Sequence, residues 1–368
     1  MQMKYYVISH SAALAMLAHQ PNPRHGDTAV EHVSLLNADV PCESEARDII
    51  EHFDLEIDKL DVLVAQKEKR RYSNHLATHL VSGELPEGSF ISLASWGPDV
   101  ALYVCCPELA YLQASCGPAH ETIYAGYAMT ADYRLDALAV GGVVNRTDSS
   151  FDSRLTTRDQ ISAYIDQTIG ARGRSKAESL LAHVAEGSRS PRESALAMMF
   201  SLPARYGGFA IGKVELNKSY RIRDGKNHRG GNRTIVRTPD VVLSAVPEWG
   251  PQATTHDANG APVKLHAAID YDSDAAHTDT TKMERDVERR NELVMLDDIA
   301  HFTVTTEIMD DYEEFSALAD RVRRKLKVRK RPLFNGRYSA EKRFFKEREV
   351  ENKRFKLWQS LVEQKRNW

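Results

Sequence analysis

The feature that most constrains this chain is an apolar strand pattern that runs directly into a cluster of acidic residues. The sequence VKLHAAIDYD is followed by SDAAHTD, which places Asp270, Asp272, Asp274 and His277 within eight positions. Like charges this close repel one another and raise each other's pKa unless a cation or hydrogen bonds offset them. The segment is therefore either a solvated acidic loop or a metal site.

Strand geometry predicts where these carboxylates point. Side chains alternate between the two faces of a strand. Ala267 and Ile269 would then face a core, while Asp270 and Asp272 share the other face about 7 Å apart. Asp240 begins the preceding strand pattern, TPDVVLSAV, and would lie beside them if the two strands pair. Oxygen ligands of this kind suit Mg²⁺ or Mn²⁺, which keep some water and take a substrate phosphate.

Helix and strand patterns are mixed in the amino-terminal half. SEARDIIEHFDL and PELAYLQASCG are typical of helices, whereas KLDVLVAQ, GSFISLASW and DVALYVCC are typical of strands. The pattern changes after AEGSRSPRES, near Gly187. We therefore predict an α+β domain over residues 1–187, with a regulatory or scaffolding role and contact with a protein partner.

The second half predicts a further α/β domain over residues 188–328. A helix begins at Ser190, and DGKNHRGGNR has the composition of a flexible, basic connection. The strands TPDVVLSAV and VKLHAAIDYD follow. TTKMERDVERRNELVML is typical of a helix and AHFTVTT of a strand, with more helix after Asp310.

The last part of the chain is strongly basic. Residues 321–368 hold eighteen Lys and Arg against five Glu, a net charge of +13, although the whole chain carries only -3. Such an asymmetry favours contact with a polyanion, because phosphate contacts by Lys and Arg release counterions. The alternative is a solvated helix whose charges keep it soluble. We interpret residues 329–368 as a basic helical tail.

The second half resembles a known family. Glu193 in an opening helix, Asp240 in RTPDVVL, and AIDYDSDAAHTD before ERDVERRNEL are similar to the PD-(D/E)xK nuclease superfamily. The closest resemblance is to its very-short-patch-repair-like branch, found in abortive-infection antitoxin-like proteins. The resemblance covers residues 190–326. It implies an α/β/α restriction-endonuclease-like sandwich and phosphodiester hydrolysis with Mg²⁺.

The resemblance also implies roles for individual residues. Asp240 and Asp270 match the metal-binding carboxylates, with Glu193 as an accessory carboxylate, and Asp272 stands where the superfamily has lysine. His277 matches a histidine that contacts phosphate or moves a proton. The family usually has Glu where this chain has Asp270. Basic side chains of the following helix and of the basic arm would bind nucleic acid: Arg289, Arg290, Arg323, Arg324, Lys325 and Lys327.

Each of these residues also has a purely structural interpretation. Ser190 and Glu193 have the spacing of a capping box, in which the glutamate only satisfies backbone donors. Asp274 would simply turn the chain, and His277 alone is more often a surface histidine. Asp240 and Asp270 are the hardest to explain in this way, since each adjoins an apolar strand run.

The amino-terminal half carries no comparable motif. His75 and His79 are four residues apart without an accompanying glutamate pattern, so we interpret them as a surface pair. The four cysteines lack CxxC spacing, which favours a reducing cytoplasm over a zinc or disulfide framework. No apolar run is long enough for a membrane span.

These observations predict a cytoplasmic, metal-dependent nuclease that acts on nucleic acid, DNA by preference, in defence or genome maintenance. The alternative is a non-cleaving DNA-binding regulator of toxin-antitoxin type. A purely structural or protein-interaction role is a third interpretation.

Overall fold

The fold is described from a computed structural model of the 368-residue chain. It divides into two compact units, Met1 to Glu186 and Gly187 to Arg366, which are described separately. The structure describes residues 4–22, 34–81, 83–95, 99–136, 138–139, 142–146, 154–226, 232–272, 299–331 and 338–363.

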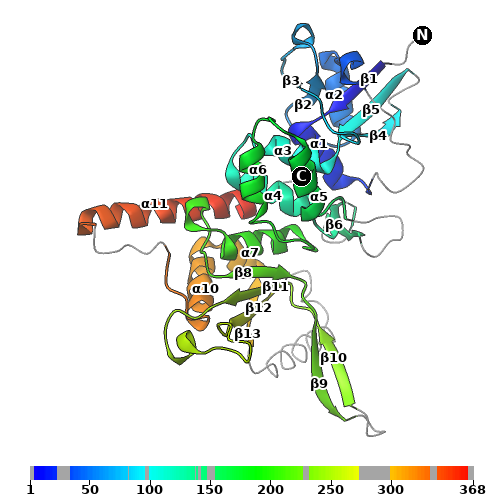
Figure 1. The fold of residues 1–368 in the computed structure, drawn as a ribbon. Coiled ribbons are helices and arrows are strands. Elements are labelled where there is room, and N and C mark those ends of the chain that lie inside the picture. Colours follow the sequence, from blue (N-terminus) through cyan, green and yellow to red (C-terminus); the bar gives the residue numbers. More distant parts are fainter. Residues whose placement is uncertain are drawn as a thin grey trace. The chain divides into compact units, whose positions relative to one another are not determined.

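The first unit is built on a mixed five-stranded sheet. Its strands run in the order β3, β2, β1, β5, β4, with β1 parallel to β5 and β2 parallel to β3 (Figure 1). The strands are β1 (Lys4–Ile8), β2 (Leu60–Val64), β3 (Leu76–Leu80), β4 (Phe90–Ser95) and β5 (Val100–Cys105). A short hairpin joins β6 (Tyr133–Leu135) to β7 (Val143–Asn145).

The described part of this unit also contains six α-helices. They are α1 (His10–His19), α2 (Glu43–His52), α3 (Pro107–Ala114), α4 (Ala119–Met129), α5 (Arg158–Gln167) and α6 (Arg174–Leu181). Helix α3 begins at Pro107, where a missing N–H costs nothing. The helix and strand segments predicted between residues 44 and 117 are confirmed. The apolar amino-terminal segment forms β1 and the buried helix α1.

The second unit contains a mixed four-stranded sheet in the order β13, β12, β11, β8. Neighbours β8, β11 and β12 are antiparallel, whereas β12 and β13 are parallel. The strands are β8 (Lys213–Leu216), β11 (Val241–Ala245), β12 (Leu265–Asp272) and β13 (Ile299–Thr305). The helices are α7 (Pro191–Ser201), α9 (Thr306–Asp310), α10 (Tyr312–Lys325) and α11 (Ala340–Trp358).

A long two-stranded ribbon leaves this sheet between β8 and β11. Strands β9 (Tyr220–Lys226) and β10 (Asn232–Arg237) pair antiparallel and project together (Figure 1). The glycine-rich segment that the sequence indicates as a flexible connection is therefore largely strand at both ends. Backbone pairing across the ribbon outweighs the low strand propensity of its Gly and Asn residues.

Helix α7 supplies much of the core of the second unit. Its residues 194–200 are all buried, and Phe200 packs on Phe315 of α10 with ring centroids 5.3 Å apart. The amphipathic helix α10 buries Phe315, Leu318 and Val322. Both units thus combine helices with mixed sheets, and the chain is α/β.

The basic carboxy-terminal segment lies within the second unit. The α11 residues Arg354 and Trp358 are buried, and the Trp358 Nε1 donates to the Met309 carbonyl oxygen over 2.9 Å. The region predicted as a tail, 329–368, therefore contributes to the packing of this unit through α11.

Replacing this tryptophan tests the packing. Trp358→Ala should destabilise the second unit by about 3–5 kcal/mol, because a large buried side chain is lost and the Met309 carbonyl loses its donor. Calorimetry of the full chain should show one thermal transition lowered by about 10 °C. Phe345→Ala on the same helix is the matched control, since Phe345 is 61% exposed. Equal transitions for both variants would contradict the packing role.

None of the helices in the described ranges combines the length and the apolar character that a membrane crossing needs.

Candidate active site

The two carboxylates predicted to converge do so at one end of the β11/β12 pair. The register pairs Val241 with Ile269, which brings Asp240 next to Asp270. The Asp240 N–H donates to Asp270 Oδ1 over 3.2 Å, and the Tyr271 N–H donates to Asp240 Oδ2 over 2.8 Å. Each carboxylate therefore accepts a hydrogen bond from a main-chain N–H, and these bonds fix the orientation of both side chains.

A histidine on the neighbouring strand completes the contacts of Asp270. The Nε2 of His301, on β13, lies 2.9 Å from Asp270 Oδ2. Both side chains are largely shielded from water, with exposed fractions of 7% for His301 and 15% for Asp270. A hydrogen bond between a carboxylate and an imidazole at this depth can orient the ring and hold or move a proton.

Glu193 lies at the start of α7 with both carboxylate oxygens occupied. Its Oε2 accepts from the Arg189 N–H over 2.8 Å and from Asn217 Nδ2 over 2.9 Å. Its Oε1 accepts from Ser190 Oγ over 3.1 Å, and the Glu193 N–H donates back to that hydroxyl. Ser190 therefore caps the helix, but Glu193 accepts from one backbone N–H and two side chains, which differs from the predicted capping box in which it only satisfies backbone donors. Burial raises the pKa of Glu193, although the three hydrogen bonds to its carboxylate oppose the shift.

Asn217 connects the helix carboxylate to the paired aspartates. Asn217 follows β8 in the left-handed region with φ 49°, a conformation that Asn tolerates better than most residues. Its N–H donates to the Asp240 carbonyl oxygen over 3.0 Å while its side chain holds Glu193. A continuous polar row thus runs from α7 across the sheet: Glu193, Asn217, Asp240, Asp270 and His301.

The other predicted catalytic residues have different positions. Asp272 ends β12 opposite Thr305 of β13, two positions beyond Asp270 on the same strand. His277 and the basic helix residues Arg289 and Arg290 lie outside the described residues. Strand β12 also differs from the predicted alternation, since Ala267, Ala268 and Ile269 are all buried. β12 is a central strand between β11 and β13, and residues on both of its faces are buried at its centre.

The predicted nucleic-acid-binding residues of the basic arm divide into two groups. Arg323 donates to Asp320 and to the Val328 carbonyl oxygen, and Lys327 donates to Gln252 and lies over the Trp249 ring. These two side chains are already engaged in contacts within the protein. Arg324 and Lys325 are exposed on the last turn of α10. Of the four predicted residues, these two present their charge mainly to solvent, and Arg324 Nε also donates to the Asp320 carbonyl oxygen over 3.2 Å.

The metal prediction rests on two carboxylates. Among the described residues no group of three or more His, Cys, Asp and Glu side chains is arranged to hold a metal ion. Mg²⁺ typically needs only one or two protein carboxylates, because water and substrate phosphate complete its shell. Asp240 and Asp270, adjacent and fixed by N–H donors, fit that smaller requirement.

Comparisons with known proteins add no family assignment. No family model, curated protein or solved structure matches the chain. The function must therefore be inferred from the site itself.

Two residues of the polar row were not found by sequence reasoning. His301 lies in the strand run AHFTVTT, where it is the one ionisable side chain, and that was the available signal. Asn217 lies in a turn, and no motif distinguishes it. Their roles depend on pairing between strands that are far apart in sequence.

Proposed function

We propose that the second unit is a metal-dependent nuclease that hydrolyses phosphodiester bonds in nucleic acid, with DNA as the preferred substrate. The observation that carries the proposal is the juxtaposition of Asp240 and Asp270 at one end of adjacent strands, with His301 hydrogen-bonded to Asp270. Two carboxylates beside an imidazole combine the groups needed to bind a hard cation and to move a proton.

The order of elements supports assignment to the PD-(D/E)xK superfamily. A helix, α7, precedes three antiparallel strands, and β13 then pairs parallel to the third of them. A helix at the start and α10 after the last strand would complete a restriction-endonuclease-like α/β/α sandwich. In that assignment the carboxylates occupy the second and third strands of the sheet.

The residues of the row divide the chemistry between them. Mg²⁺ or Mn²⁺, when held by Asp240 and Asp270, would stabilise negative charge on a scissile phosphate and lower the pKa of water. The backbone donors at Asp240 and Tyr271 keep the carboxylates in place before substrate arrives. His301 Nε2, 2.9 Å from Asp270 Oδ2, would orient that carboxylate and supply an imidazole to hold or pass a proton. Glu193 and Asn217 support the strand end from the helix side.

A second candidate function is a DNA-binding regulator that does not cleave. Two features of position 270 favour this function. Its aspartate is one methylene shorter than the Glu usual in this branch, and the carboxylate already has hydrogen-bond partners within the protein. Asp270 accepts from both the Asp240 N–H and His301. In a regulator this network would only stabilise the fold.

A cleavage assay separates the two functions. Purified full-length protein would be incubated with end-labelled single-stranded and double-stranded DNA and RNA, with Mg²⁺, Mn²⁺ or a chelator. We expect cleavage that requires a divalent cation. Binding without cleavage under every condition would favour the regulator, and cleavage undiminished by chelator would contradict metal dependence.

Metal binding can also be measured without substrate. Two adjacent carboxylates repel each other until a cation neutralises them, so Mg²⁺ or Mn²⁺ should raise the melting temperature. At ten times the dissociation constant the stabilisation is about 1.4 kcal/mol. Asp240→Asn should remove the shift while still accepting from the Tyr271 N–H.

The matched control for this measurement is Asp257→Asn. Asp257 lies in an exposed loop of the same unit, where its carboxylate accepts from the Asn259 N–H. The melting temperature of the Asp257→Asn protein should rise with metal as much as that of the wild type. A wild-type melting curve that does not move at millimolar metal would count against the site.

A further inference from the structure

The first unit contains a histidine cluster that the candidate nuclease site does not involve. His10 and His79 stack with ring centroids 3.7 Å apart, and His79 Nε2 lies 2.7 Å from Asp61 Oδ1. Ser11 Oγ donates to the other oxygen of Asp61. His79, predicted to form a surface pair with His75, lies on β3 with 34% of its side chain exposed, and Asp61 and His10 contact it there.

The backbone at His10 is strained. His10 has φ 49°, in the left-handed region that costs a non-glycine residue about 1 kcal/mol or more. It is the first residue of α1, two positions after the end of β1, and its N–H donates to Gln113 Oε1 over 2.8 Å. Its Nδ1 lies 3.0 Å from Ser9 Oγ. Strain of this kind, maintained by surrounding hydrogen bonds, is concentrated at functional sites.

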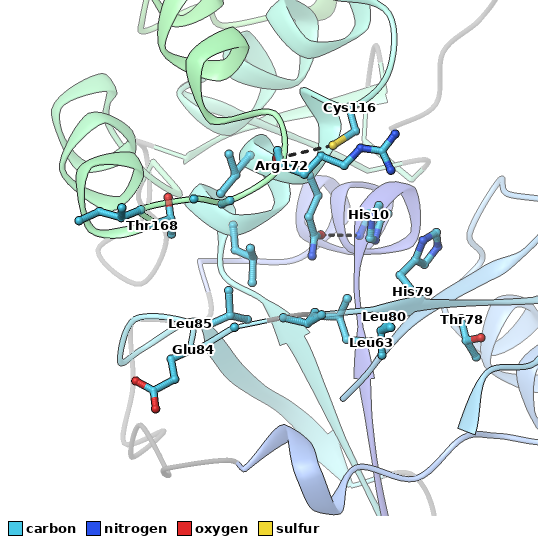
Figure 2. Close-up of a pocket in the computed structure, with 18 of the residues that line it drawn as sticks. His10, Leu63, Thr78, His79, Leu80, Glu84, Leu85, Cys116, Thr168 and Arg172 are labelled. Carbon is cyan, nitrogen blue, oxygen red and sulfur yellow. Dashed lines mark hydrogen bonds between the residues drawn. The ribbon is translucent and has the colours of Figure 1, made fainter. Parts of the chain in front are cut away.

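The two rings line one end of a cavity of about 630 Å³. Figure 2 shows His10 and His79 side by side at that end, with Glu84, Leu85 and Thr168 at the other. All of its lining residues belong to the first unit. The volume lies within the range of small-molecule sites, about 300–1,000 Å³.

Two arginines supply the positive charge of the cavity lining. The described lining includes Arg70 and Arg172 with one carboxylate, Glu84, and the Asp61 carboxylate behind it is occupied by His79 and Ser11. The amino terminus of the ten-residue helix α1 also begins at this wall, without an acidic residue in its first turn or a capping bond from the Ser9 side chain. Helix amino termini attract negative charge, and Arg binds phosphate through paired N–H donors.

Part of the wall is apolar. Leu63, Leu109 and Leu112 line it as largely buried side chains, together with Leu80 and Leu85. An apolar wall of this kind favours a ligand that has a ring or chain to bury as well as a charge. The imidazoles of His10 and His79, with Thr78, Gln113 and Thr168, add hydrogen-bonding groups to the same lining.

We propose that this cavity binds a phosphate-bearing small molecule of the nucleotide class, with Arg70 and Arg172 at the phosphate, the His10 and His79 rings hydrogen-bonding the ligand, and the leucine wall against its base. The site is separate from the candidate nuclease site, and its ligand is a mononucleotide rather than a polymer, because the cavity is the size of one small molecule.

The test is calorimetric titration of the full-length Asp270→Ala protein in chelator, which keeps the candidate nuclease site out of the measurement. The probes are AMP, GMP, CMP, UMP and inorganic phosphate. We expect at least one nucleotide to bind with one site per chain and more tightly than phosphate. Added in this background, His10→Asn and Arg172→Gln should each weaken that binding by about tenfold or more, the effect of losing one charge-assisted or buried hydrogen bond.

The substitutions are chosen to leave the fold intact. Asn tolerates the left-handed backbone that His10 adopts, and Arg172 is exposed. His75→Asn and Arg158→Gln are the matched controls, since both lie in the first unit outside the cavity lining. The proposal is overturned if no nucleotide binds at millimolar concentration, if phosphate binds as tightly as every nucleotide, or if the site variants bind like the controls.

Discussion

Asp270→Ala should abolish cleavage while nucleic-acid binding persists. The substitution removes one of two metal-binding carboxylates in the proposed nuclease, and a metal ion supplies several kcal/mol of transition-state stabilisation. The rate should fall by about a thousandfold or more, at about 1.4 kcal/mol for each factor of ten. Asp270→Glu should retain cleavage, because it restores the longer side chain usual in this branch.

The measurement compares cleavage and binding in parallel with Mn²⁺. Because Asp270 also accepts from the Asp240 N–H and from His301, Asp270→Ala can lower stability, and its melting temperature must be measured. Asp270→Asn keeps an acceptor in place and is the second variant, with Asp257→Ala as the control. Undiminished cleavage by Asp270→Ala would overturn the assignment. Tight binding without cleavage by the wild type and all variants would favour the regulator.

Acid should destabilise the first unit through His10. Burial, and secondarily the neighbouring His79, lower the pKa of His10 from 6.5 to about 4, while Asp61 opposes the shift. Between these two values the unfolded chain binds a proton that the folded chain does not. Stability is therefore lost as the pH falls from 6.5 to about 4, by about 3 kcal/mol in total.

His10→Asn isolates this contribution. The variant lacks the titrating ring, so the difference in unfolding free energy between wild type and variant should change with pH in that interval and level off above it. Urea unfolding of the full chain at several pH values measures the difference. His75→Asn corrects for acid effects elsewhere. A difference that stays constant from pH 7 to pH 4 would contradict a neutral, buried His10.

The elements of the fold were predictable where local patterns are strong. The alternating and apolar runs of β2, β5, β11 and β12 identified these strands, and Pro107 marked the start of α3. The meeting of Asp240 with Asp270 was also predictable, since both adjoin strand runs that are consecutive in the core of the sheet. Here the approach of the two carboxylates follows from strand periodicity.

The remaining contacts depend on pairing that no local pattern contains. His301 reaches Asp270 only because β13 lies parallel to β12, and the Asp61 contact to His79 needs β2 beside β3. His10 joins that cluster through its left-handed backbone at the first residue of α1. The ribbon β9/β10 was missed because its Gly and Asn residues resemble a loop when pairing is unknown.

The parallel pairing of β12 with β13 also has a consequence for the order of folding. Two antiparallel strands can join through a short turn, but parallel neighbours require a long crossover, here from Asp272 to Ile299. Closing such a loop costs chain entropy before any contact compensates for it. Asp240 and Asp270 come together as soon as β11 and β12 pair, whereas His301 reaches Asp270 only after the crossover has closed and β13 has paired with β12. A newly made chain would thus assemble its carboxylates first and gain the imidazole last.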